Sequence, residues 1–301
     1  MLPKIPLAWL AALSSLAGPV LAQDPAGAPS QAARPEPKVL GVDVTYMANA
    51  GFFFESGRYS VLIDAFLREE TDMFAALPEQ VNKDLVNARP PFDGLTLVFV
   101  SHVHPDHVQM RGLEKFLTNN PQAQLVSGPD VIQALRDGAR DLEAIQRRMT
   151  PVRTARGAMT QAVQEEMSIE FFELEHSGKA YADVRNVAHL VEIGGVRLLH
   201  VGDAEPTLEN YKPYDLKSRR IDVVFVPYWY FGKPEGVQVL KEHIQARTVV
   251  ACHVPPREWE ELNEFLKSNF PDVILFKDTL EKRHFLPAGE EPAEPPRPAG
   301  G

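Results

Sequence analysis

Cysteine is almost missing from this chain of 301 residues, which carries Cys252 and no other. A single cysteine cannot form a disulfide within the chain. No cysteine lies near the N-terminal apolar stretch either, which excludes a lipid-anchored cysteine there. Cys252 neighbours His253 but points to the opposite face of its expected strand. We therefore expect its thiol to be buried and inert rather than a metal ligand.

Positive charge is also scarce. The chain has 31 Lys and Arg against 41 Asp and Glu, and its formal net charge of −10 argues against binding to a polyanion such as DNA or RNA. We therefore expect no nucleic-acid partner. With 44% hydrophobic and 24% charged residues, the composition is that of an ordinary globular protein with a sizeable core.

The N-terminal stretch 1–22 predicts a signal peptide. Lys4 precedes an apolar run, Pro19 breaks that run, and Val20 and Ala22 supply the small residues that a signal peptidase requires. The alternative is an uncleaved membrane anchor, since the run is nearly long enough to span a bilayer. Cleavage predicts a periplasmic or secreted protein without a stable membrane anchor.

The rest of the chain divides into three parts. Residues 23–38 are rich in Pro, Ala and Gly and predict a flexible linker. Residues 287–301 have a similar composition and predict a disordered Pro-rich tail. Between them, residues 39–286 predict one folded domain.

Short apolar strands dominate this domain, in two similar sets. The expected strands are 39–47, 51–55, 60–66, 95–101, 124–128, 168–175, 187–193, 196–202, 222–228, 248–254 and 273–277. Helices are expected at 107–120, 129–138, 236–246 and 256–269. The glycines at 194–195 predict a two-residue hairpin turn, whereas 67–94 and 136–165 are poorly patterned. Together these elements predict an α/β fold of two packed sheets with helices outside.

Histidine is concentrated in one short stretch: three of the 9 histidines lie in SHVHPDH, residues 101–107. His102 and His104 are two apart on an extended loop, so their side chains point to the same side and can approach one cation. The proline that follows bends the chain, which lets Asp106 and His107 face a second cation beside the first. The alternative is a polar surface cluster in which Asp106 caps the next helix.

Three further ligand candidates lie where apolar strands give way to Gly or Pro. They are His176 in ELEHSG, Asp203 in LLHVGDAEP and His253 in VVACHVPP. Strand ends are the usual place for site residues in layered α/β folds. The order and spacing of the three, more than any one of them, predict a closed metal site.

The remaining histidines are expected outside the ligand set. His189 competes with His176 as the third ligand, but it lies inside its strand rather than at the end, so we favour His176. His200 precedes a Gly-Asp pair in a strand and is expected in the core or behind the site. His243 and His284 have the surroundings of surface residues.

With these motifs in order, the chain resembles the metallo-β-lactamase-fold hydrolase superfamily. The resemblance rests on SHVHPDH, EHSG, HVGDAE and ACHVPP, with GFFFESGRYSVLIDAF as the opening hairpin, and it covers most of 39–286. The glycine after NA, this hairpin and IDVVFVPYW are similar to the branch that contains ascorbate-phosphate lactonase and N-acyl-phosphatidylethanolamine phospholipase D. One departure follows DH, where many relatives have a glycine. This chain has Val108 and Gln109 there, which changes the floor of the pocket.

The resemblance implies a four-layer αββα sandwich with a two-metal site between the edges of its sheets. Carried over residue by residue, it implies His102, His104 and His176 at the first metal, Asp106, His107 and His253 at the second, and Asp203 bridging both. Asp64 would steer a ligand histidine by hydrogen bonding from behind.

The chemistry that such a site implies is hydrolysis. Two divalent cations that share a water would lower its pKa towards 7. The bridging hydroxide would then attack an ester, lactone, amide or phosphodiester bond of a small-molecule substrate or a lipid-like one. Asp106 would orient the hydroxide and later carry a proton. Nitrogen and carboxylate ligands without thiolate predict zinc, with iron or manganese as alternatives.

Substrate contacts and two other functions stay open. Tyr228, Trp229 and Tyr230 follow a strand that should end near the site and are candidates for an aromatic wall around the substrate, or else they fill the core. Lys233 is a candidate for a phosphate contact. The other functions are a mononuclear iron dioxygenase of this fold acting on sulfur compounds and a non-catalytic metal-binding module. A flavin-coupled diiron reductase is disfavoured, because it usually has a glutamate where this chain has His104.

Overall fold

The computed structural model describes residues 4–6, 40–68, 73–164 and 167–290. The predicted linker, the signal peptide apart from residues 4–6, and the tail from residue 291 onward lie outside the described residues. Within the described part of the chain, no helix has the length and apolar character that crossing a membrane requires.

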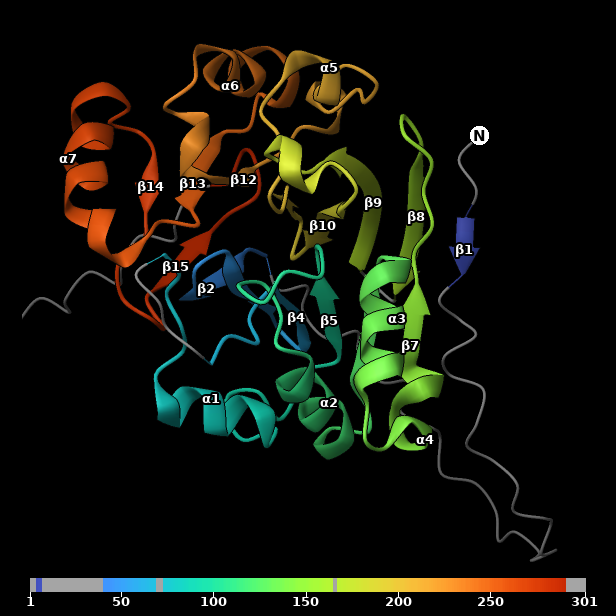
Figure 1. The fold of residues 1–301 in the computed structure, drawn as a ribbon. Helices are drawn as coiled ribbons and strands as arrows, with labels where there is room; N and C mark the ends of the chain where they lie inside the picture. The colour runs from blue at the N-terminus through green and yellow to red at the C-terminus, as the bar shows by residue number, and fades with distance from the viewer. Residues whose placement is uncertain (1–3, 7–39, 69–72, 165–166, 291–301) are drawn as a thin grey trace, which may run out of the picture.

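Two β-sheets form the middle of the described molecule (Figure 1). The first has the order β15-β2-β3-β4-β5-β6-β7. Its strands are β2 (Val42–Ala48), β3 (Gly51–Ser56), β4 (Tyr59–Ile63), β5 (Leu97–Val100), β6 (Gln124–Ser127), β7 (Met149–Pro151) and β15 (Lys282–Phe285). Pairs from β15 to β4 are antiparallel, and pairs from β4 to β7 are parallel.

The second sheet has the order β1-β8-β9-β10-β11-β12-β13-β14. Its strands are β1 (Lys4–Pro6), β8 (Met159–Gln164), β9 (Met167–Glu175), β10 (Arg185–Ile193), β11 (Val196–His200), β12 (Val223–Pro227), β13 (Thr248–Cys252) and β14 (Ile274–Leu275). Pairs from β8 to β11 are antiparallel, and pairs from β11 to β14 are parallel. Apart from the parallel pair of β1 and β8, the two sheets therefore repeat one pattern of antiparallel and then parallel strands.

Helices cover the outer face of each sheet (Figure 1). Over the first sheet lie α1 (Glu79–Val86), α2 (Met110–Asn119), α3 (Pro129–Gly138) and α4 (Leu142–Ile145). Over the second lie α5 (Leu208–Tyr211), α6 (Pro234–Val239), its π-helical continuation η6 (Leu240–Ile244) and α7 (Trp259–Asn269). Short 3-10 turns are η2 (Gln146–Arg148), η3 (Lys179–Tyr181), η4 (Lys217–Arg219), η5 (Tyr228–Tyr230) and η7 (Pro256–Glu258).

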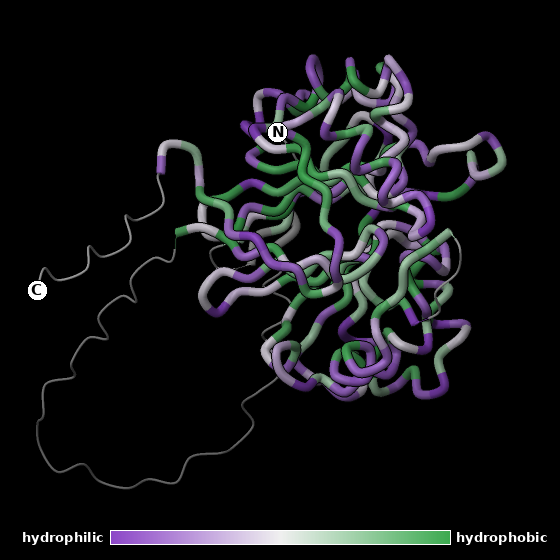
Figure 2. Tube along the Cα trace, turned by 90° about the vertical axis from the view of Figure 1, so that its left-hand side faces the viewer, coloured by the Kyte–Doolittle hydropathy of each residue, from purple (hydrophilic) through white to green (hydrophobic). Residues whose placement is uncertain are grey.

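Hydrophobic clusters fill the spaces between the four layers. Phe52 and Phe54 of β3 pack between the sheets against Phe225 of β12, whereas Phe53 points to the helices on the other side. Side chains alternate across a strand, so a strand that is buried on both faces is a continuous apolar run. Figure 2 shows these hydrophobic strands running through the middle of the molecule. The four-layer αββα sandwich is thereby confirmed.

Elements with strong patterns form where the sequence predicts them. Gly194 and Gly195, with φ of 59° and 79°, make the turn between β10 and β11, because a two-residue hairpin turn of this kind needs two left-handed residues. The poorly patterned stretch 67–94 contains α1, and 136–165 contains α4, β7 and β8. The sequence does not predict β15, since its largely exposed residues show no apolar alternation.

The chain direction places one set of strand ends together. In the first sheet β4 and β5 are parallel neighbours, so their carboxyl ends lie at the same edge. In the second sheet β9, β11 and β13 run in the same direction, so theirs do as well. The loops that leave these ends carry the candidate site residues.

Candidate metal centre

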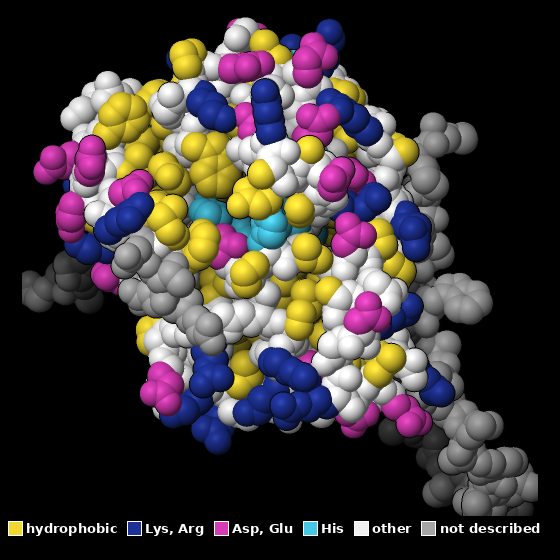
Figure 3. Space-filling model, in the orientation of Figure 1, with side chains coloured by type: hydrophobic (Ala, Val, Ile, Leu, Met, Phe, Trp, Pro, Cys, Tyr) yellow, Lys and Arg dark blue, Asp and Glu magenta, His cyan; other side chains and the backbone are white. Residues whose placement is uncertain are grey.

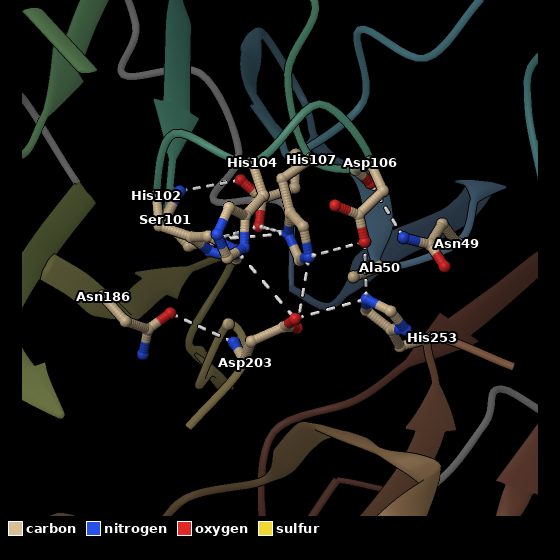
Figure 4. Close-up of polar contacts among 12 residues, drawn as sticks. Asn49, Ala50, Ser101, His102, His104, Asp106, His107, Asn186, Asp203 and His253 are labelled. Carbon is tan, nitrogen blue, oxygen red and sulfur yellow. Dashed lines mark hydrogen bonds and ion pairs between the residues drawn. The ribbon is translucent and has the colours of Figure 1, made fainter. Parts of the chain in front are cut away.

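The loop that leaves β5 holds four of the predicted ligands on one tight turn. Its start is fixed where Ser101 N donates to Asp64 Oδ1 over 2.7 Å. Its far side closes where the backbone nitrogens of His107 and Val108 both donate to His104 O over 3.0 Å. The turn aims the side chains of its four ligand candidates toward Asp203 and His253 (Figure 4).

A first cluster is formed by His102, His104 and His176, whose ring nitrogens converge. His102 Nε2 lies 3.1 Å from His104 Nδ1 and 3.2 Å from His176 Nε2. Two nitrogens bound to one tetrahedral zinc at 2.0–2.1 Å would lie roughly 3.3 Å apart. The three side chains are therefore already spaced as ligands of a single ion.

Hydrogen bonds on the far side of two of these rings determine which nitrogen carries the proton. His176 Nδ1 donates to Ser177 O over 2.7 Å, so its Nε2 has a lone pair. The Ser101 hydroxyl donates to Asp64 Oδ2 over 2.5 Å, and it therefore accepts from His102 Nδ1 at 2.9 Å. Two Nε2 lone pairs then face each other, an arrangement that a cation between them would stabilise.

A second cluster is formed by Asp106, His107, Asp203 and His253. His253 Nε2 lies 2.9 Å from Asp106 Oδ2 and 3.3 Å from Asp203 Oδ2. His107 Nε2 lies 3.1 Å from Asp203 Oδ1. His107 Nδ1 donates to Asp64 Oδ2 over 2.8 Å, which directs the other ring nitrogen into the cluster.

Asp203 lies between the two clusters. Besides its contacts in the second cluster, its Oδ2 is 3.9 Å from His102 Nε2 and 3.8 Å from His176 Nε2. Figure 4 shows it below the 101–107 loop, facing His107 and His253. Its carboxylate has the position that a ligand shared by two ions needs.

The two clusters differ in charge. Burial lowers the pKa of all three histidines in the first cluster, most of all His102, which keeps them neutral. Burial also favours the neutral form of the histidines in the second cluster. There, however, the carboxylates of Asp203 and Asp106 outweigh burial and raise the pKa of His253 to about 9. Asp203 and Asp64 raise that of His107 well above its usual value in the same way.

The donor atoms in both clusters fit divalent metal ions. His107 Nε2 and Asp203 Oδ1 are buried and face each other over 3.1 Å, but neither makes a well-formed hydrogen bond, which is costly for buried polar atoms. The donors are imidazole nitrogens and carboxylate oxygens without thiolate, a set that suits zinc, iron and manganese alike. The clusters are thus able to bind metal.

Three polar residues that the sequence reasoning missed hold the ligand loops in place. Asn186 accepts from Asp203 N over 3.0 Å and donates to Val201 O over 2.9 Å. Asn49 donates to Asp106 O over 2.8 Å. Ser101 links Asp64 to His102. Ser101 lies in SHVHPDH and Asn49 in the NA before the opening hairpin, but neither pattern indicates these hydrogen bonds, and Asn186 lies in no quoted motif.

Backbone conformation contributes to the same site. Gly202 has φ +59°, and a Cβ there would lie 2.1 Å from Asn186 Oδ1, so only glycine allows Asp203 its position. His253 has φ 58° and Asp64 φ 47°, both in the left-handed region that costs side-chain-bearing residues energy. His253 N donates to Asn49 O over 2.9 Å, which helps to hold that conformation.

The other histidines lie outside the two clusters. His189 is fully buried, with its ring 5.1 Å from that of Phe99. His200 donates from Nε2 to Ala50 O over 2.8 Å, behind Asp203. His284 is exposed and His243 half-buried. Cys252 is buried between the sheets, and burial raises the pKa of its thiol well above the usual value.

A pocket opens onto both clusters. Its volume is about 390 Å³, and its walls include Phe74, Tyr181 and Trp229 beside the metal ligand candidates. Figure 3 shows the histidines at the bottom of this hollow, framed by hydrophobic side chains. The Trp229 ring lies 5.1 Å from that of His253, and the Tyr181 ring 4.9 Å from that of His104.

The predicted aromatic wall needs a correction. Trp229 lines the pocket and Tyr228 lines a neighbouring groove, but Tyr230 is fully buried and its hydroxyl donates to Ala204 O over 3.2 Å. The three residues form the 3-10 turn η5, in which successive side chains point roughly 120° apart. They cannot form one wall, and Tyr230 belongs to the core.

Comparisons with known proteins agree with this geometry. A family profile described as a beta-lactamase superfamily domain matches residues 43–253. No curated protein matches the chain. The structure of an isothiocyanate hydrolase from Delia radicum gut bacteria is similar, with a TM-score of 0.59 and 15% identity over 81% of this chain and 99% of that one.

Two further solved structures have the same fold. The metallo-beta-lactamase fold protein YhfI from Bacillus subtilis has a TM-score of 0.55 and 14% identity over 82% of this chain and all (100%) of that one. A metallo hydrolase from the archaeon Ignicoccus hospitalis has a TM-score of 0.53 and 16% identity over 81% and 98%. At these identities the likeness shows the fold alone. The matched profile spans more than half of the chain and includes every residue of both clusters, and the chain therefore belongs to the beta-lactamase superfamily.

Proposed function

We propose that this protein is an exported metal-dependent hydrolase that holds two divalent cations. His102, His104 and His176 would bind the first cation, and Asp106, His107 and His253 the second, with Asp203 shared. When bound, the cations supply Lewis acidity and make water a nucleophile at neutral pH. The narrower resemblance to the branch of ascorbate-phosphate lactonase and N-acyl-phosphatidylethanolamine phospholipase D belongs to this proposal as well.

The observation that carries the proposal is the convergence of the first cluster. His102 Nε2 and His176 Nε2 face each other over 3.2 Å, while their Nδ1 atoms are used in other hydrogen bonds. Neither nitrogen can donate to the other, so a cation between them or an added proton would stabilise the pair. Burial opposes the proton by lowering both pKa values.

The pocket favours an acyl bond over a phosphodiester. No Lys or Arg lines it within the described part of the chain. Lys233, the candidate that the sequence offers for a phosphate contact, is paired with Glu205 over 2.7 Å. Phosphate recognition usually relies on such cations, so we place an ester, lactone or amide first.

Asp106 is the residue we assign to proton transfer. Its Oδ2 accepts from His253, while its backbone oxygen is held by Asn49 over 2.8 Å. It lines the pocket, so its carboxylate is within reach of a bound substrate. Neighbouring His253 and His107 outweigh burial and lower its pKa, which keeps it ionised and able to accept a proton.

The proposal is tested with chromogenic ester, lactone, lactam and phosphodiester substrates, before and after chelation and with zinc, manganese or iron(II) restored. We expect acyl hydrolysis that chelator removes and one of the metals restores. His176→Ala should abolish it, whereas His284→Ala, a matched change at an exposed histidine, should not. Turnover that survives both chelation and His176→Ala would contradict the assignment.

A further inference from the structure

A second groove adjoins the pocket over the candidate metal centre. It has a volume of about 470 Å³ and lies between η5 and α7, where Tyr228, Trp229, Leu262 and Phe265 line it. Leu262 and Phe265 are three residues apart on α7, so they share one face of that helix. Phe265 is 39% exposed, unusually open for a large apolar side chain.

Trp229 joins this groove to the metal pocket, because it lines both. Its ring lies 5.1 Å from that of His253 on one side. Figure 3 shows hydrophobic side chains continuing from the histidines toward α7. Each of the two volumes falls in the range of small-molecule sites. The two cavities therefore share a wall at Trp229, and a ligand that passes this ring would reach from the candidate metal centre into the groove.

The charges around the groove indicate what kind of ligand it takes. Lys233, a cation that lines it, is neutralised by Glu205 at 2.7 Å. The other charged side chains there are Glu258 and Glu261. Glu258 is itself paired with Arg257 over 3.3 Å, so an anionic group would be repelled mainly by the Glu261 carboxylate. An uncharged apolar chain would instead cover Phe265, Leu262 and Trp229.

We propose that this groove is a subsite for an uncharged apolar tail on the acyl side of the substrate. The inference rests on the proposed hydrolase function and adds a substrate class to it: esters or amides of medium-length acyl chains. The reacting bond lies at the candidate metal centre, and the tail extends past Trp229 toward α7. Hydrolysis consumes one water, breaks the bond between the acyl carbon and its leaving group, and releases the free acid and the protonated leaving group.

The first test is a series of p-nitrophenyl esters from acetate to octanoate. Half-burial of each added methylene should raise kcat/KM about twofold, so octanoate should exceed acetate on the order of 50-fold. Gly232 lines the groove, and a Cβ there meets only Trp229 O at 3.8 Å. Gly232→Phe should therefore fill the groove without strain and reduce the octanoate-to-acetate ratio more than tenfold.

Gly94→Phe is the matched control, because Gly94 lies in neither cavity and a Cβ there meets nothing within 4 Å. It should leave the ratio as in the unaltered chain. The subsite is overturned if kcat/KM does not rise with chain length, or if Gly232→Phe leaves the octanoate-to-acetate ratio unchanged. In either case, hydrolysis of the acetate ester would still support the hydrolase function.

A binding measurement separates the subsite from the hydrolase function. Titration with 1-octanol should change the tryptophan fluorescence of the unaltered chain, because Trp229 lies in the groove, and this change should be absent in Gly232→Phe. If no ester is hydrolysed but this difference is seen, the hydrolase proposal fails and the apolar subsite stands. If octanol produces the same response in both proteins, the subsite is overturned.

Discussion

The histidines at the open edge of the sandwich and His189 in its interior are the same residue type, but their ring nitrogens have different surroundings. At the edge, each ring nitrogen of His102 and His176 has an assigned neighbour: one makes a hydrogen bond, and the other faces the cluster. In the interior, both nitrogens of His189 lack a partner, and its ring packs between Phe99 and Phe171. Residue type alone therefore does not make a ligand.

What separates them is position along a strand. His176 directly follows the end of β9, where the chain turns into a loop and side chains from several strands can meet. His189 lies in the middle of β10, where the pleat directs it into the core between the sheets. The comparison predicts that edge substitutions remove function with little loss of stability, and that interior substitutions do the reverse.

The largest effect is expected for His102→Ala. It removes a ligand candidate from the first cluster, so turnover should fall on the order of a thousandfold, as loss of several kcal/mol of transition-state stabilisation implies. The free energy of unfolding of the chelated protein should change little. Steady-state kinetics and denaturant unfolding measure the two quantities. Near-normal turnover would show that the histidines at the edge are not needed for function.

A smaller effect is expected for Ser101→Ala. The change removes the hydroxyl that accepts from His102 Nδ1, while His107 keeps its own bond to Asp64. Zinc affinity of the first cluster should fall roughly tenfold, as for other residues that orient metal ligands from behind. A competitive chelator titration should show one of two binding steps shifted.

Ser127→Ala provides the control for Ser101→Ala. Ser127 is also fully buried, but its hydroxyl donates to Val100 O and contacts neither cluster. It should leave both zinc steps unchanged, and Ser101→Thr, which keeps the hydroxyl, should retain most of the affinity. Equal shifts in both steps for Ser101→Ala would show that the serine does not act on one cluster selectively.

The last prediction concerns the interior, and it is a prediction of stability rather than of activity. Burial lowers the pKa of His189 to about 3, against an ordinary value of about 6.5. Between these values the unfolded chain binds the extra proton, so His189 makes the protein less stable as pH falls. From pH 7.5 to pH 5.0, the unaltered chain should lose about 2 kcal/mol more unfolding free energy than His189→Leu.

That measurement is made with chelator in both samples, so that metal release does not contribute. Turnover of the metal-loaded His189→Leu protein at pH 7.5 should equal that of the unaltered chain. The interpretation of His189 as an inert core residue would be wrong if the unfolding free energy of His189→Leu changed with pH as that of the unaltered chain does. It would also be wrong if the variant lost activity.

The sequence predicts the parts of the structure that local patterns encode. Apolar alternation predicts most strands, and paired glycines predict the β10-β11 turn. Ligand-type residues at strand ends predict the seven side chains that the structure brings together. Each of these signals is contained within a few neighbouring residues of the chain.

What the sequence does not predict depends on contacts between distant segments. Asn49 and Asn186 hold Asp106 and Asp203 through single hydrogen bonds, which no spacing of residues in the sequence predicts. Three consecutive aromatic residues suggest one wall, but the 3-10 turn at 228–230 sends Tyr230 into the core. The groove beside α7 likewise forms only when η5 and that helix pack together.

The most direct test of the account is a crystal structure of the zinc-loaded protein with anomalous scattering measured at the zinc edge. We predict two peaks roughly 3.5–4 Å apart. One should lie about 2.0–2.1 Å from the ring nitrogens of His102, His104 and His176, and the other beside His107 and His253, with Asp203 between them. A single peak, or ions bound away from these side chains, would contradict the account.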